Sequence, residues 1–190
     1  IEPSRGLGDV YKRQAAMVAP TPVSALLHAV AVVKAGVFSI LMVICYIFGP
    51  EFMNTSGSGK FLIWASTITL FLSSVIAIRK NDIKARLAYS TVSQLSYIIL
   101  GGAIATNYSL IASVSNIMMH GVGKITLFFC AGAIYVSTKI TKITDLNGIG
   151  HKMPLTFIAF SIGALSIIGI PPLGGSWSKF YLLLGAAQSE

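Results

Sequence analysis

The stretch SLIASVSNIMMHGVGKITLFFCAGAIYVST, residues 109–138, holds only two side chains that can carry a positive charge, His120 and Lys124. A helix that crosses the hydrocarbon core of a bilayer needs about 20 predominantly apolar residues. The stretch is long enough to span the membrane even if it tilts or bends. It therefore predicts a transmembrane helix with ionisable groups near its middle.

Further apolar runs predict four more passes. Their approximate bounds are residues 22–48, 61–78, 87–105 and 153 onward, the last interrupted at residues 169–175 and resuming at Trp177. The chain is 54% hydrophobic and 11% charged, which leaves too few charges to cover the surface of a soluble domain. The sequence thus predicts an all-α, polytopic transmembrane helix bundle of about five passes, the last broken mid-membrane.

Basic residues gather on one side of this topology. If the passes alternate, the N-terminus and the loops 79–86 and 139–152 share a side; without residues 1–14 it holds seven lysines and arginines, against Lys60 alone opposite. Cytoplasmic loops are enriched in Lys and Arg. We therefore expect these segments to be cytoplasmic in a bacterial-type inner membrane. The basic residues form no continuous patch, which argues against nucleic acid as a partner.

The two ends depart from the pattern. Residues 1–14, IEPSRGLGDVYKRQ, are polar and lack the apolar core of a signal peptide. We expect either a disordered lead-in or, the interpretation that we favour, sequence foreign to the protein. Residues 15–190 are expected to be a fragment, because the last apolar run stops abruptly.

Three lysines, Lys34, Lys124 and Lys179, fall inside predicted passes. A lysine at the centre of a bilayer costs about 2.5–3.5 kcal/mol on the insertion scale. We therefore expect all three to face a hydrated interior rather than lipid.

Five polar residues of residues 109–138 fall within one arc of the helix at 100° per residue: Ser109, Ser113, Asn116, His120 and Lys124. A packing seam explains the serines, and is the interpretation that we favour for them. For His120 and Lys124, which are neighbours at i and i+4, we favour a proton relay, because a packing seam needs no cation. Two cations about 7 Å apart repel by roughly 2.4 kcal/mol at a dielectric constant near 20, so protonation of one favours release from the other.

The first pass carries His28 and Lys34, about 240° apart on the helix. His28 is either a satisfied core histidine or part of the same relay, with Ser24 one turn earlier to orient its ring. Snorkelling to the interface is the alternative for Lys34, but its mid-span position makes the reach long.

The interruption of the last pass predicts a broken helix. It is formed by Gly169, Pro171, Pro172, Gly174 and Gly175, and Lys179 follows it. Irregular backbone at membrane depth is tolerated where it lines a cavity, and broken helices recur at transporter ion sites. The alternative is a simple loop between two short helices.

Four motifs together resemble the antiporter-like membrane subunits shared by complex I and by Mrp-type cation/proton antiporters. They are PTPVSALLHAVAVVKAGVF (20–38), DIKARLAYSTVSQLSYIILG (82–101), MMHGVGKITLFFCAGAI (118–134) and MPLTFIAFSIGALSIIGIPPLGGSWSKF (153–180). The combination of His28 and Lys34 is most similar to the D-type members of Mrp antiporters, and also to their A-type members. The resemblance implies that His120 and Lys124 lie on the family's central polar axis. It also implies that Lys179 is the lysine of the broken helix.

The resemblance implies a proton-translocating subunit of a multisubunit monovalent cation/proton antiporter. A complex I subunit (NADH:quinone oxidoreductase) or a related membrane hydrogenase is the alternative, and a passive membrane anchor is the second alternative. Partners would be other membrane subunits, lipid and H⁺, with Na⁺ left open. Cys45 and Cys130 lie singly in apolar runs, so we expect no cofactor, no metal and no redox centre of its own.

Overall fold

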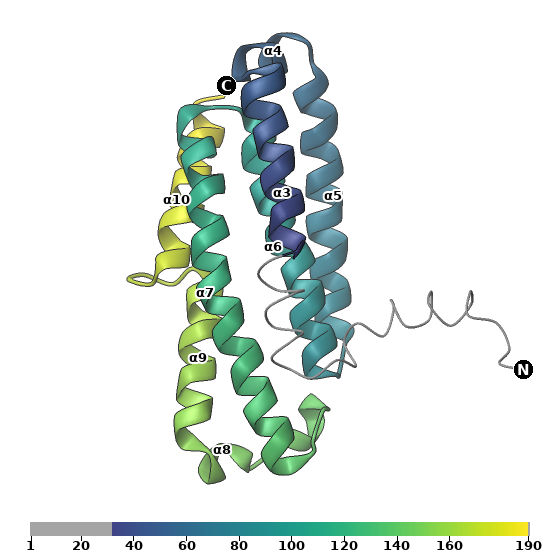
Figure 1. Ribbon diagram of the computed structural model, residues 1–190, viewed down its shortest axis with the longest axis vertical. Coiled ribbons are helices and arrows are strands. Elements are labelled where there is room, and N and C mark those ends of the chain that lie inside the picture. Colours follow the sequence, from purple (N-terminus) through teal and green to yellow (C-terminus); the bar gives the residue numbers. More distant parts are fainter. Residues whose placement is uncertain (1–31, 190) are drawn as a thin grey trace, which may run out of the picture.

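A computed structural model describes residues 32–189 as a bundle of helices packed side by side (Figure 1). The elements are α3 (Val32–Met42), a π-helix (Val43–Phe48), α4 (Pro50–Thr55), α5 (Ser58–Arg79), α6 (Ile83–Ile104), α7 (Asn107–Thr138), a 3-10 helix (Ile143–Leu146), α8 (Ile149–Lys152), α9 (Pro154–Ile168) and α10 (Gly174–Ala187).

Three of these helices, α5, α6 and α7, are long and apolar enough to cross a membrane, and Val32–Phe48 and α9 are shorter apolar helices. The predicted all-helical, multi-pass membrane bundle is confirmed. The last pass is divided into α9 and α10, which follow one another along one side of α7 (Figure 1). Ser24 and His28 lie outside the described residues.

Local signals set where the helices begin and end. Asp82 caps α6 by accepting a hydrogen bond from the Ala85 backbone N–H at 2.9 Å. Thr106 and Ser109 form a reciprocal capping box at the start of α7. Helix α9 begins with Pro154 and ends at Ile168, and Gly169 follows as its cap with a φ of 91°, a conformation that residues with a Cβ rarely adopt.

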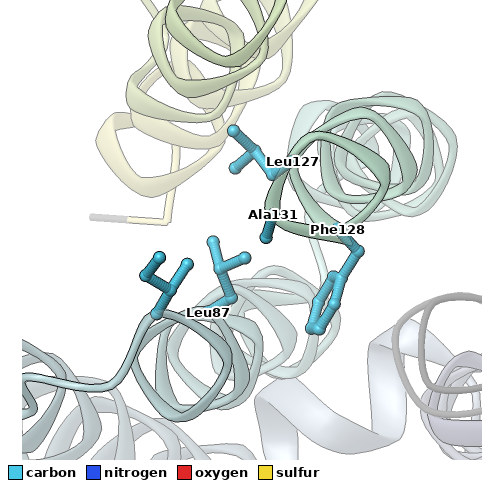
Figure 2. Close-up of a cluster of buried hydrophobic side chains, with 5 residues drawn as sticks. Leu87, Leu127, Phe128 and Ala131 are labelled. Atoms are coloured by element: carbon cyan, nitrogen blue, oxygen red, sulfur yellow. The ribbon is translucent and has the colours of Figure 1, made fainter. Parts of the chain in front are cut away.

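The centre of the bundle is α7, which packs against α6, α9 and α10. A buried apolar cluster joins α6 to α7 through Ile83, Leu87, Leu127, Phe128 and Ala131 (Figure 2). The α9 helix packs against the same cluster with partly buried apolar side chains. Helix α5, by contrast, leaves much of its apolar surface exposed, as a helix facing lipid does.

The two basic loops meet at one end of the bundle. The Ile83 N–H donates to Thr141 O at 3.0 Å, and the Ile143 N–H donates to Asn81 O at 2.8 Å. Lys60 lies at the start of α5, which is at the other end (Figure 1). We call the end with the two loops the basic end. That it faces the cytoplasm stays a prediction.

Candidate functional site

Helix α7 turns its polar residues into the bundle. Ser109, Ser113, Asn116, His120 and Lys124 are all buried, with at most 7% of any of them exposed. Ser113 donates to Ile98 O of α6 at 2.9 Å, a contact that belongs to helix packing. The face of α7 that points into the bundle therefore carries a row of polar side chains.

Lys124 is completely buried between α6 and α7. Its ammonium donates a hydrogen bond to Leu87 O of α6 at 2.9 Å, and the same oxygen accepts the Thr91 hydroxyl at 2.9 Å. Leu87 is the fifth residue of α6, so this contact lies about 6 Å along the helix axis from its first residue. The ammonium of Lys124 thus lies beside the half of α6 that is nearer the basic end.

Lys34 reaches α7 from α3. It is 6% exposed, and its ammonium donates to Ile117 O at 2.8 Å. The same nitrogen lies against Gly121, where the Cβ of any other residue would collide with it. A glycine at this position lets the cation approach the backbone of α7.

Lys179 lies in α10 and reaches back across the break. Its ammonium donates to Ile167 O at 2.9 Å and to Ile168 O at 2.6 Å, and it lies 5.7 Å from the centroid of the Tyr97 ring. The last carbonyls of a helix have no intrahelical partner and form the negative end of its dipole. The start of α10 disfavours a cation, but the end of α9 supplies the acceptors that stabilise it.

His120 stands between these three lysines. It is 3% exposed, and within residues 32–189 its two ring nitrogens are the only buried side-chain nitrogen or oxygen atoms without a hydrogen-bond partner. Lys124 follows one turn later on α7, and the ammonium of Lys34 lies against Gly121, the residue next to His120. Ser178, the neighbour of Lys179, bonds to Asn116 one turn before His120. Buried polar atoms are almost always satisfied in folded proteins, so an imidazole left open marks a place where a proton or water can bind.

The polar interior continues from α7 to α10. The Ser178 hydroxyl donates to Asn116 Oδ1 at 3.3 Å and to Gly175 O at 3.1 Å. A small cavity beside this pair, lined also by Tyr97 and Lys179, has room for about one water molecule. Sequence reasoning missed Ser178 and Tyr97, because neither residue type is unusual in an apolar helix.

An apolar cavity of about 170 Å³ opens between the helices toward the basic end. Ile83, Arg86 and Leu87 of α6 line it, together with Ile134 of α7 and Phe160 of α9. Leu87, whose backbone oxygen accepts the ammonium of Lys124, is thus also one of the residues that line this cavity. No group of three His, Cys, Asp or Glu side chains that could hold a metal ion occurs within the described range.

The fold and this interior define a class: a multi-pass helical membrane protein with cationic and imidazole side chains held inside its bundle. The chain matches the family model "NADH:quinone oxidoreductase/Mrp antiporter, TM" over residues 12–190, and it belongs to that family.

The chain is similar to subunits of known membrane complexes. It is 35% identical over 173 residues to NADH-quinone oxidoreductase subunit N of Desulforudis audaxviator, covering 90% of this chain and 34% of that protein. It is 38% identical over 185 residues to NAD(P)H-quinone oxidoreductase chain 5 of Synechocystis, covering 92% and 26%. A chain in the structure of the Mrp complex from Dietzia is 32% identical, with a TM-score of 0.81 and coverage of 92% and 19%. The chain thus spans about a third or less of the length of these relatives.

Proposed function

We propose that this chain is part of a proton-translocating subunit of a multisubunit monovalent cation/proton antiporter. Protons pass along Lys34, His120, Lys124 and Lys179. The observation that carries this proposal is the buried imidazole of His120, whose ring nitrogens have no hydrogen-bond partner within residues 32–189. It lies close to the buried ammonium of Lys34, which rests against the adjacent Gly121, and one turn before the buried Lys124. A purely structural core histidine has its ring nitrogens satisfied.

The way the lysines are held supports movement of protons rather than permanent pairing. Each of the three ammonium groups donates to backbone carbonyls of a neighbouring helix. A carboxylate partner would fix the charge strongly, whereas a carbonyl leaves the lysine able to give up its proton. His120 can then accept a proton on either ring nitrogen and pass it on.

The arrangement of the helices supports a route for the protons. Lys34 contacts α7 from α3, and Lys179 lies on α10, on the other side of α7 (Figure 1). His120 on α7 connects the two. Lys124 links this row to the basic end, because its acceptor Leu87 lines the cavity that opens there. We propose that protons exchange with that side of the membrane through Lys124.

A second candidate function is proton pumping in an NADH:quinone oxidoreductase. The curated relatives carry that name, and in such a complex other subunits would perform the redox chemistry. The two candidates differ in what drives the protons. Loss of the row would reduce sodium extrusion in an antiporter, and redox-coupled proton pumping in an oxidoreductase.

The test uses the full-length subunit in its complete complex, reconstituted into proteoliposomes. His120→Leu should lower proton transport at least tenfold, because a positioned acid–base group contributes about a hundredfold or more. His151→Leu is the matched control, since His151 is an exposed histidine in α8, and it should leave transport unchanged. Full transport in His120→Leu would instead favour the passive-anchor alternative.

A further inference from the structure

Two lysines from different helices share one aromatic ring at the basic end. Lys84 in the first turn of α6 and Lys139 at the C-terminus of α7 each place their ammonium nitrogen 5.4 Å from the centroid of the Tyr135 ring. The two nitrogens are therefore no more than twice that distance apart. Both cations gain from the ring, by about 0.5–1 kcal/mol each at such exposed sites, but they also repel one another.

Within residues 32–189 neither ammonium of this pair forms a salt bridge. The carboxylate of Asp82 keeps its charge but is directed to the Ala85 N–H, which it accepts as the cap of α6. Asp145 accepts the hydroxyl of its neighbour Thr144 at 3.0 Å. The cluster of Lys84, Tyr135 and Lys139 thus presents two unneutralised cations where the helices meet the membrane surface, the level at which tyrosine is enriched.

An apolar stripe runs along α7 to this cluster. Its members are Val114, Met118, Val122, Phe129 and Val136, each between 47% and 71% exposed. At 100° per residue they fall within an arc of about 80°, so they form one continuous face. From Val114 to Val136 the stripe rises about 33 Å, close to the thickness of the hydrocarbon core. Lys139 follows at its end.

We propose that the cluster of Lys84, Tyr135 and Lys139 binds the phosphodiester of an anionic phospholipid, whose acyl chains lie along the half of the α7 stripe nearest the cluster. A phosphate supplies the missing negative charge between the two ammonium groups, and basic pockets between transmembrane helices are known to take such headgroups. The stripe favours a lipid over a free phosphate, because a free anion has no apolar part to use it. This site does not depend on the proposed proton row.

The experiment measures how strongly the complete complex retains phosphatidylglycerol. The complex is purified from mixed phosphatidylcholine and phosphatidylglycerol and analysed by native mass spectrometry and lipid titration. The double variant Lys84→Gln/Lys139→Gln should weaken phosphatidylglycerol binding roughly thirty-fold, from the loss of two lysines near the membrane surface. Phosphatidylcholine binding should not change.

Two control variants keep the outcome interpretable. Lys84→Arg/Lys139→Arg keeps both charges and should retain the lipid. Lys80→Gln removes a lysine that lies over another ring, that of Tyr89 at 5.6 Å, and should have little effect. Undiminished phosphatidylglycerol binding in the double glutamine variant would overturn the proposal. So would displacement of the lipid by equimolar inorganic phosphate, or cross-linking of Lys84 and Lys139 to an acidic segment of a neighbouring subunit.

Discussion

Replacement of Lys124 by methionine should separate the function of this residue from its contribution to the fold. Lys124 is fully buried and makes one side-chain hydrogen bond, to Leu87 O. Methionine has a similar length without the charge. The carbonyl that loses the ammonium still accepts the Thr91 hydroxyl, so no buried acceptor is left open.

The magnitude follows from two opposing contributions. The variant loses one hydrogen bond from a charged donor, a net contribution of about 1.5–3 kcal/mol. It also removes the desolvation penalty of a buried ammonium, which is several kcal/mol in real proteins. We therefore expect the free energy of unfolding of the complex to be unchanged or to rise by roughly 1–3 kcal/mol, the difference between these contributions.

Transport should change in the opposite direction. Methionine cannot carry a proton, so proton flux in proteoliposomes should fall at least tenfold, as for loss of a positioned proton-transfer group. Thermal unfolding of the purified complex and dye-reported proton flux measure the two effects on the same preparation. Lys60→Met, at an exposed position at the other end of the bundle, is the control. A complex that is less stable yet transports at the normal rate would show that Lys124 is structural.

Three further predictions concern other contacts. Gly121→Ala should displace the ammonium of Lys34, which lies against this glycine, and lower proton flux. Gly36→Ala is the control and should leave flux unchanged, because its Cβ would meet nothing within 4 Å. Equal flux in both variants would contradict the contact between Lys34 and Gly121. Ser178→Ala removes two buried hydrogen bonds and should reduce the free energy of unfolding by about 1–2 kcal/mol, measured by thermal unfolding. In intact cells, a cysteine replacing Lys142 should react with a membrane-impermeant thiol reagent only after the membrane is opened, while one replacing Lys60 should react from outside; the reverse would invert the topology.

Much of the architecture follows from apolar runs and helix breakers alone. The uncharged run from Phe61 to Ile78 predicted the body of α5, and the glycines and prolines of residues 169–175 predicted the division of the last pass. The helical period also placed His120 and Lys124 on one face, which the structure turns inward. These features depend on local sequence, and local sequence is enough to predict them.

The partners across the bundle could not be predicted in this way. Which helices are neighbours depends on packing between distant segments, so nothing near Lys34 in the sequence points to Ile117. The contact of Lys179 with the end of α9 could not be predicted either, because the interpretation of the sequence considered only α10, the helix that carries the lysine. The pairing of the two basic loops between Asp82 and Lys142 also joins segments 60 residues apart.

The acceptors of Lys34, Lys124 and Lys179 are all main-chain oxygens, and this affects how the protein can vary. Substitution of Ile117, Leu87 or Ile168 by another residue leaves the backbone carbonyl oxygen in place. Each lysine therefore keeps its hydrogen-bond acceptor when these side chains change during evolution. Apart from Gly121, which has to leave room for the ammonium of Lys34, no second position has to change in step with these lysines. A search for correlated substitutions would therefore not detect the hydrogen bonds of these lysines. The lysines would be conserved, but no covarying position would be found for their acceptors.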